Sequence, residues 1–226
     1  MDYAAIIYII LKLVMIKFNK THGSLIPRES FNVDVDTKKL REVNTRILGG
    51  GASQNFAAFK LIEYYIAYER PEYVVEIGSQ KGGLSVYIGT IAAVTEQFLF
   101  HTFEINKSRD WSNREVEGSG HWFEKMESIS PYCKSHEMNI FSRDTYNYIN
   151  EYVSQYKSFI ICDGGDKPRE LALYSTLMKT GDTVMVHDFG NEITDSDIDY
   201  SIFEEYVPFS TRFTDNATLF KLLRKK

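Results

Sequence analysis

Short apolar runs alternate with helical segments along most of this chain, and that alternation limits the fold more than any other feature of the sequence. Five runs have the length and apolar content of buried strands: residues 73–77, 97–104, 132–138, 158–163 and 183–187. Helical spacing or helix-start residues mark the segments before and between them: residues 54–69, 83–95, 121–129, 143–154 and 169–178. Strands that alternate with helices form right-handed parallel βαβ units, with helices on both faces of one sheet.

The end of the chain breaks this alternation. Two strand-like runs, 206–213 and 217–223, follow one another with only a short polar turn between them. Two successive strands form a hairpin, so one of them runs antiparallel to its neighbours. We therefore predict an α/β fold, with a Rossmann-like, doubly wound, mostly parallel seven-stranded sheet and one antiparallel strand from a C-terminal hairpin.

The N-terminal part does not follow the pattern. Residues 3–18 are nearly all apolar, but this run is shorter than the roughly 20 residues that span a bilayer. It has neither the charged start nor the small-residue cleavage site of a signal peptide. A packing helix or homo-oligomer contact, an anchor on a membrane surface, and sequence upstream of a true start at Met15 remain open interpretations. We assign residues 1–52 to this extension and residues 53–226 to one domain.

Charge and cysteine content limit the partners and the cellular compartment that we expect for the protein. A net charge of -5 and a pI near 5.6 leave no basic face beyond a short tail at 221–226, so we expect no nucleic-acid partner. Two cysteines, Cys133 and Cys162, indicate no disulfide framework and suit a reducing compartment. Cys162 lies within a predicted strand and is expected in the core. We therefore expect a cytoplasmic protein, with membrane association only through residues 3–18.

Glycines and a carboxylate surround the end of the predicted strand at 73–77. The spacing is Glu76-x-Gly78-x-x-x-Gly82, with Ser79 and Gln80 between the glycines. Glycines permit a tight strand-to-helix turn and let a ligand approach the backbone closely. A dinucleotide site needs glycine at position 80, and the side chain of Gln80 would obstruct a pyrophosphate there. The segment instead resembles the first signature motif of class I S-adenosylmethionine-dependent methyltransferases, whose cofactor carries no phosphate.

A second acidic residue, Glu104, ends the next predicted strand. Ligands in open α/β sheets bind beyond the carboxyl ends of the strands. There the Glu104 carboxylate can accept hydrogen bonds from both ribose hydroxyls of a nucleoside, a feature that NAD and S-adenosylmethionine share. The resemblance implies that Ser79, Gln80 and Gly82 approach the methionine half and that Asn139 and Ile140 lie near the adenine. The implied cofactor-binding set is Glu76, Gly78, Ser79, Gln80, Gly82, Glu104, Asn139 and Asp163.

Carboxylates and a histidine stand at the ends of the fourth and fifth predicted strands. Asp163 closes the run at 158–163, and His187 and Asp188 close the run at 183–187. Residues 158–190 resemble the metal-assisted O-methyltransferases related to the cephalosporin-hydroxylase-like and macrolide sugar methyltransferase group. The resemblance implies that Asp163, His187 and Asp188 form the catalytic centre. Asp163 and Asp188 would be oxygen ligands of Mg²⁺, and His187 would be a further ligand or a general base.

The centre departs from that family at two positions. His187 stands where a glutamate commonly precedes the second aspartate, and Asp166 stands where a histidine often follows Asp-Gly-x. A set that includes an imidazole is softer and less anionic than one of carboxylates alone, which suits Mg²⁺ less well. Metal dependence therefore stays open.

Together these patterns predict methyl transfer from S-adenosylmethionine to an oxygen of a small molecule or sugar. One alternative is an NAD-type Rossmann oxidoreductase, against which Gln80 argues. The other is a non-catalytic nucleoside-binding module, against which the clustering of Asp163, His187 and Asp188 argues. The acidic segment at 191–200 is expected to be a solvated loop or a lid over the acceptor. The sequence does not identify the acceptor.

Overall fold

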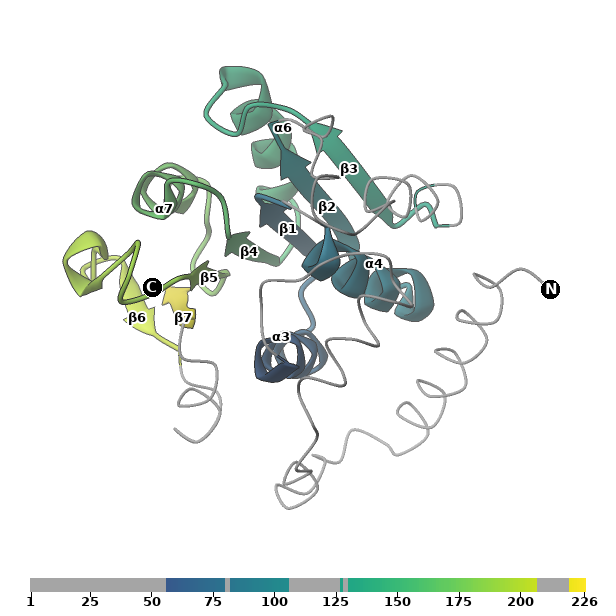
Figure 1. The fold of residues 1–226 in the computed structure, drawn as a ribbon, viewed down its shortest axis with the longest axis horizontal. Coiled ribbons are helices and arrows are strands. Elements are labelled where there is room, and N and C mark those ends of the chain that lie inside the picture. Colours follow the sequence, from purple (N-terminus) through teal and green to yellow (C-terminus); the bar gives the residue numbers. More distant parts are fainter. Residues whose placement is uncertain (1–55, 80–81, 106–126, 128–129, 207–219) are drawn as a thin grey trace, which may run out of the picture.

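The computed structural model describes residues 56–79, 82–105, 127, 130–206 and 220–226. Within them, seven strands form one sheet in the order β3-β2-β1-β4-β5-β7-β6 (Figure 1). β7 pairs antiparallel with both β5 and β6, whereas the other neighbouring strands pair in parallel. The predicted α/β fold, a mostly parallel seven-stranded sheet with one antiparallel strand near the C-terminus, is therefore confirmed.

The elements have the following bounds. The strands are β1 (Tyr73–Ile77), β2 (Leu99–Glu104), β3 (Cys133–Glu137), β4 (Ser158–Cys162), β5 (Thr183–His187), β6 (Phe203–Glu205) and β7 (Phe220–Lys225). The described helices are α3 (Phe56–Glu69), α4 (Gly83–Thr95), α6 (Arg143–Val153), α7 (Lys167–Ser175) and the 3₁₀ turn η3 (Asp195–Asp197).

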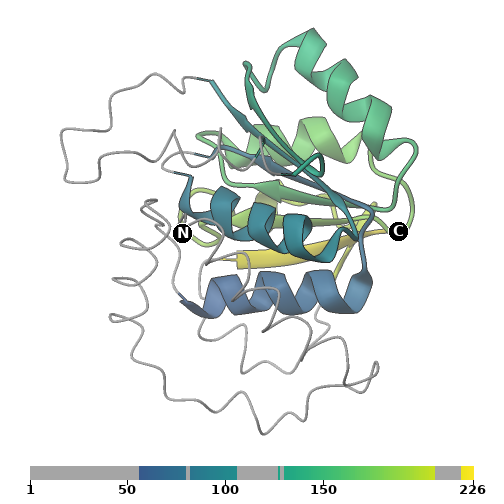
Figure 2. The ribbon, with the colours of Figure 1, turned by 90° about the vertical axis from the view of Figure 1, so that its right-hand side faces the viewer.

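The sheet has a hydrophobic core on each face, because both faces are covered by helices. Figure 2 shows α3 and α4 on one side of the sheet and α6 and α7 on the other. Successive strand residues alternate between these cores: Val75 packs on the α6/α7 side, and Val74 packs on the α3/α4 side. The same alternation recurs in β4 and β5, so the fully apolar strands that the sequence shows are explained by burial on both faces.

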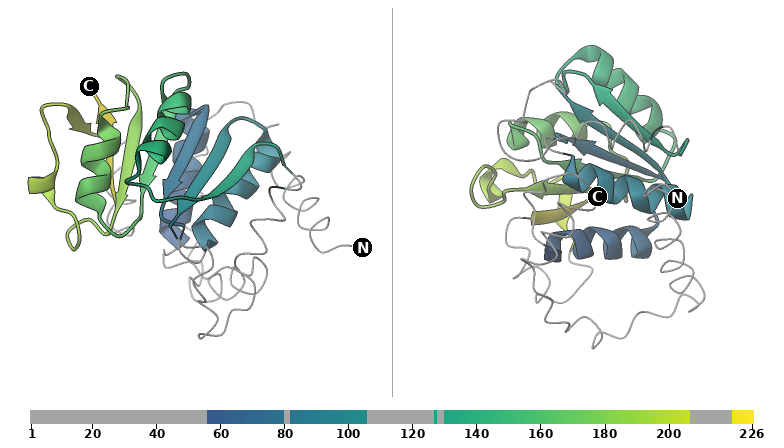
Figure 3. Two further views of the ribbon diagram at one scale, coloured as in Figure 1. Left: turned by 90° about the horizontal axis from the view of Figure 1, so that it is seen from above. Right: turned by 45° about the vertical axis from the view of Figure 1, so that its right-hand side comes forward.

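One of the two C-terminal strands, β6 at Phe203–Glu205, was not predicted. The other, β7 at Phe220–Lys225, overlaps the run predicted at 217–223 and continues two residues past its end. Residues 207–219 lie outside the described residues. Two of the three β6 residues, Glu204 and Glu205, are exposed at the end of the sheet that lies opposite β3 (Figure 3). A strand this short and polar has no apolar run to reveal it in the sequence.

The N-terminal predictions lie outside the described residues. These include the apolar run at 3–18 and the boundary between 52 and 53. In the part of the chain that is described, no helix combines the length and the apolar character needed to cross a bilayer.

A buried histidine gives the fold a defined response to acid. His101 in β2 is 1% exposed and lies among the rings of Tyr73, His136, Tyr148 and Tyr152. Its Nδ1 is 3.4 Å from the hydroxyl of Tyr73. Burial, with smaller contributions from His136 and Lys134, lowers the pKa of His101 to about 3. The folded protein therefore keeps this imidazole neutral where the unfolded chain protonates it.

We expect the free energy of unfolding to fall as the pH drops from 6.5 towards 3, by up to about 1.4 kcal/mol per pH unit from His101. His101→Phe removes this contribution and keeps the aromatic packing. Urea denaturation of both proteins between about pH 7.5 and 5 measures the effect, because the difference between them cancels the other titrating groups. A difference that does not change with pH would contradict this account.

Candidate active site

Four parallel strands bring polar side chains to one edge of the sheet. β1, β2, β4 and β5 end at Ile77, Glu104, Cys162 and His187. In register, Ile77 lies beside both Phe103 and Cys162, and Cys162 lies beside Val186, so the four ends are level. The strand ends predicted from the sequence to meet therefore do meet.

The turn after β1 is held against the turn after β4 by a contact between their backbones. Gly78 has φ +88°, and a Cβ atom there would lie 2.5 Å from Cα of Gly164 and 2.6 Å from the carbonyl oxygen of Asp163. No side chain fits in that space. The amide of Asp163 donates to the carbonyl of Ile77 at 2.9 Å, and the amide of Gly78 donates to the carbonyl of Phe103 at 2.9 Å. Gly78 therefore fixes where the turns after β1 and β4 lie relative to each other.

The glycine turn continues into α4. Gly82 has φ +74° and is the N-cap residue of α4, and its amide donates to the carbonyl of Ser79 at 2.6 Å. Both φ values are in the left-handed region that favours glycine. Ser79 and Gly82 are half-buried beside this turn, while Gln80 lies outside the described residues.

The acidic residue of the glycine motif, Glu76, points into the protein. It is 1% exposed, and its Oε2 accepts hydrogen bonds from the hydroxyl of Ser85 on α4 and from that of Thr102 on β2, the latter at 2.7 Å. Burial raises the pKa of Glu76 to about 8, although the two hydroxyl groups lower it. Glu76 therefore joins β1, β2 and the start of α4 as a protonated acid at neutral pH.

The other predicted cofactor-binding residues lie at the ends of β2 and β3. Glu104 is half-buried, and its Oε1 accepts a hydrogen bond from the amide of Ile105 at 2.9 Å. Asn139 is exposed, and its Oδ1 accepts from the amide of Phe141 at 2.9 Å. Ile140 is 9% exposed, and its carbonyl accepts from the hydroxyl of Tyr174 on α7 at 2.5 Å. These hydrogen bonds hold the three residues in place. Their contact with a cofactor stays a prediction.

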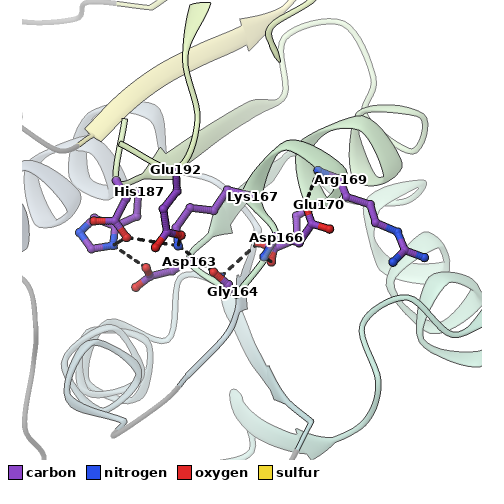
Figure 4. A network of polar contacts seen from close by, with 9 residues as sticks. Asp163, Gly164, Asp166, Lys167, Arg169, Glu170, His187 and Glu192 are labelled. Atoms are coloured by element: carbon purple, nitrogen blue, oxygen red, sulfur yellow. Dashed lines mark hydrogen bonds and ion pairs between the residues drawn. The ribbon is translucent and has the colours of Figure 1, made fainter. Parts of the chain in front are cut away.

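The predicted catalytic residues form one cluster (Figure 4). Nδ1 of His187 lies 2.5 Å from Oδ1 of Asp163 and 3.3 Å from Oδ2 of Asp188. Ligand atoms of the three residues all lie within 4.8 Å of one another, a spacing that permits a shared metal ion. An ionised carboxylate can only accept, so Nδ1 of His187 carries the proton that is donated to Asp163.

Asp188 reaches this cluster through an uncommon backbone conformation. It directly follows β5 and has φ +56°, in the left-handed region that aspartate tolerates better than most residues. This conformation places its Oδ2 near His187 and also 3.2 Å from the ammonium of Lys167. Strained residues of this kind concentrate at functional sites.

Lys167 belongs to the cluster, although the sequence analysis did not single it out. It is the first residue of α7 and is 3% exposed. Its Nζ donates to the carbonyl of Gly164 at 2.7 Å and to Oε2 of Glu192 at 2.6 Å, in addition to its contact with Asp188. Burial alone would lower the pKa of Lys167, but these two carboxylates raise it. A lysine beside an N-cap aspartate was the available sequence signal.

Glu170 is a second residue that the sequence analysis missed. It is fully buried, and its carboxylate accepts from the amides of Gly164 at 3.1 Å and Asp166 at 3.2 Å. Burial raises its pKa to about 7, and the two amides lower it. Asp166, one of the two departures from the motif that the sequence resembles, is the N-cap of α7, and its Oδ1 accepts a hydrogen bond from the amide of Arg169 at 3.3 Å. These contacts order the turn that carries Asp163.

The segment after β5, at 189–200, is fixed to the rest of the domain by buried side chains and ion pairs, unlike the solvated loop expected from the sequence. Ile193 and Ile198 are buried in the α6/α7 core, and Glu192 pairs with Lys167. Lys221 on β7 lies 3.3 Å from Asp195 and packs over the ring of Phe189. The acidic residues at 191–200 that look like a solvent-facing run in the sequence therefore include side chains that bind this segment to α7 and β7.

Comparisons with known proteins were made for the sequence and for the fold. The sequence matches no protein-family model, and no curated protein is significantly similar to it. Among solved structures, CmcI with SAH is 12% identical, with a TM-score of 0.52 over 77% of this chain and 78% of CmcI. CmcI with Mg and SAM is 11% identical, with a TM-score of 0.51 over 76% of this chain and 72% of the other. A proposed O-methyltransferase from Klebsiella pneumoniae is 11% identical, with a TM-score of 0.50 over 88% and 93%. At these identities the likeness establishes a shared fold.

The protonation of Glu76 generates a pH-dependent prediction. Its raised pKa means that the folded protein binds a proton that the unfolded chain releases above pH 4.5. We expect the free energy of unfolding to fall as the pH rises from 4.5 to about 8, by up to about 1.4 kcal/mol per pH unit from this residue. Glu76→Gln cannot ionise, so its stability relative to wild type should increase across the same interval. Urea denaturation at about pH 5, 6.5 and 8 tests this, and parallel curves would refute it.

Proposed function

We propose that this protein is an S-adenosylmethionine-dependent methyltransferase that methylates an oxygen of a small molecule or sugar. The observation that carries the proposal is the position of the Asp163–His187–Asp188 cluster, at the same sheet edge as the glycine turn and Glu104. The fold is shared with structures that hold SAH or SAM, which supports this cofactor. Gln80 in place of a glycine favours it over NAD.

The proposed cofactor site uses the carboxyl ends of β1, β2 and β3. Glu104 accepts hydrogen bonds from the two ribose hydroxyls, as the analogous acid does in nucleoside sites of this kind. The methionine half lies along the turn from Ser79 through Gln80 to Gly82, and the adenine lies near Asn139 and Ile140. Glu76 and Gly78 support this site from within the protein. Glu76 joins β1 to α4 through a hydrogen bond, and Gly78 leaves room for the backbone of Gly164. Asp163 borders the site where β1 and β4 meet.

Methyl transfer from a sulfonium requires an in-line nucleophile that can lose its proton. The Asp163–His187 pair supplies the base. Because Nδ1 of His187 donates to Asp163, the other ring nitrogen, Nε2, is the basic one. In the proposed reaction Nε2 takes the hydroxyl proton of the acceptor. A bond forms between that oxygen and the methyl carbon while the bond from sulfur to the methyl carbon breaks, which leaves SAH. His187 is then the catalytic residue, and Asp163 is its positioning residue.

The same centre has the residue types for a divalent cation. Asp163 and Asp188 would hold it through carboxylate oxygens. His187 would be a third ligand only in place of its role as the base, because a neutral imidazole has one free lone pair. Such a cation would supply stabilisation of the acceptor's alkoxide or phenolate. The spacing of the three residues fits this role, so Mg²⁺ belongs to the proposal as an additional cofactor.

Cofactor binding is tested by titration calorimetry with SAH, with NAD as the comparison ligand. We expect wild type to bind SAH, and Glu104→Ala to bind it between about 10-fold and 100-fold more weakly, because the ribose loses a charged acceptor. The matched control is Glu151→Ala, since Glu151 is an exposed glutamate on α6, away from the ends of these strands. Binding of NAD instead of SAH, or equal losses in both variants, would refute the cofactor assignment.

Catalysis is tested by following SAH release from S-adenosylmethionine with a panel of catechols, phenols and sugars. For the best acceptor, we expect His187→Gln to lower kcat by about 100-fold to 10,000-fold, the usual contribution of a general base. SAH affinity should stay within about twofold of wild type. His136→Gln, a histidine on β3 outside the cluster, should keep its kcat. SAH binding without turnover on any acceptor would favour the non-catalytic nucleoside-binding module.

A further inference from the structure

The ammonium of Lys167 has a complete set of partners inside the reaction centre. An ammonium group has three N–H donors. In this structure three acceptors surround it: the carbonyl of Gly164 at 2.7 Å, Oε2 of Glu192 at 2.6 Å and Oδ2 of Asp188 at 3.2 Å. The side chain is 4% exposed, so these contacts rather than water solvate the charge. Figure 4 shows the ammonium between Glu192 and the turn that carries Asp163.

The position of Lys167 on α7 indicates that these contacts determine its orientation. It is the first residue of the helix, directly after the N-cap Asp166. A positive charge is unfavourable at a helix N-terminus, where the helix dipole is positive. Its alkyl chain also turns back across the turn to Gly164 instead of extending into solvent. The two carboxylates therefore offset an otherwise unfavourable location.

A divalent cation in this centre would share the Asp188 carboxylate with the ammonium of Lys167. Asp188 has its Oδ2 within 3.2 Å of the ammonium and within 3.3 Å of Nδ1 of His187. Mg²⁺ binds carboxylate oxygens at about 2.0–2.1 Å, so an ion on this oxygen would lie close to a second positive charge. The two cations repel, so the ammonium of Lys167 opposes binding of a metal ion to this carboxylate.

We propose that Lys167 sets the affinity of the centre for divalent cations, by acting as an internal cation that a metal ion must displace from Asp188. This rests on the proposed function for the role of the centre, but its test needs neither cofactor nor acceptor. The same contact neutralises Asp188 when no metal is bound. Without a metal ion, the centre then contains two pairs: Asp163 with His187, and Asp188 with Lys167.

The test is Mn²⁺ binding, measured by electron paramagnetic resonance and by calorimetry in the absence of cofactor. Mn²⁺ takes the same oxygen ligands as Mg²⁺ and is observed directly. We expect wild type to bind it with a dissociation constant of about 1 mM or weaker, and Lys167→Met to bind it at least about tenfold more tightly. Lys167→Arg keeps the charge and should resemble wild type. Lys179→Met is the control, because Lys179 is exposed and its ammonium contacts only the carbonyls of Ser154 and Tyr156 among the described partners.

A second variant guards against misfolding of Lys167→Met. The pair Lys167→Met with Glu192→Gln removes one positive and one negative charge, so the net charge of the cluster is unchanged. Because Glu192 is half exposed, its replacement is mild. This double variant should still bind Mn²⁺ more tightly than wild type, because Asp188 is released.

Two results would overturn the proposal. One is a wild-type dissociation constant for Mn²⁺ of about 10 μM or less, with binding lost in Asp188→Asn. The other is an Mn²⁺ affinity that is unchanged in both variants that carry Lys167→Met. SAH titration of the same samples separates this inference from the proposed function. If SAH binds but Mn²⁺ affinity does not respond to Lys167, only the present inference fails. If Mn²⁺ responds but SAH does not bind, the role of Lys167 stands and the methyltransferase proposal fails.

Discussion

The turn after β1 and the turn after β4 touch through their backbones, and the rest of the site is built around that contact. A Cβ atom at Gly78 would lie 2.5 Å from Cα of Gly164, and a Cβ atom at Gly164 would lie 2.2 Å from a carboxylate oxygen of Glu170. Neither residue can carry a side chain without moving its neighbours. The turns that follow β1 and β4 are therefore in direct backbone contact at Gly78 and Gly164. Asp163, which lies between them, takes its position from this contact.

Several acidic groups share this edge of the sheet, and each is stabilised in a different way. Glu76 is protonated and accepts hydrogen bonds from two hydroxyl groups. Glu170 accepts hydrogen bonds from two backbone amides. Asp163 is paired with His187, and Asp188 is paired with Lys167. Buried carboxylates need such partners because water no longer solvates them.

The sequence allowed the fold to be predicted where burial alone determines the pattern. β1 and β5 have their predicted bounds because each is a short, mostly apolar run between turn residues. The convergence of Asp163, His187 and Asp188 was also predictable, since parallel strands end at one edge. β6 was not predicted, because two of its three residues are exposed glutamates. Lys167 and Glu170 were missed because helix periodicity does not show a side chain that turns back across the preceding turn.

The two departures from the methyltransferase motifs that the sequence resembles become consistent with each other once Lys167 is considered. Asp166 has no contact with the cluster of Asp163, His187 and Asp188 among the described interactions, and caps α7 instead. It thereby starts the helix at Lys167, whose ammonium then reaches Asp188. His187, in place of a carboxylate, removes one negative charge from the centre and adds a base that Asp163 orients. A centre in which an imidazole replaces a carboxylate and an ammonium pairs with Asp188 has less need of a divalent cation to balance its charge. The exchanges that weaken the resemblance at 166 and 187 are therefore the ones expected if proton removal depends on the imidazole and charge balance on the lysine.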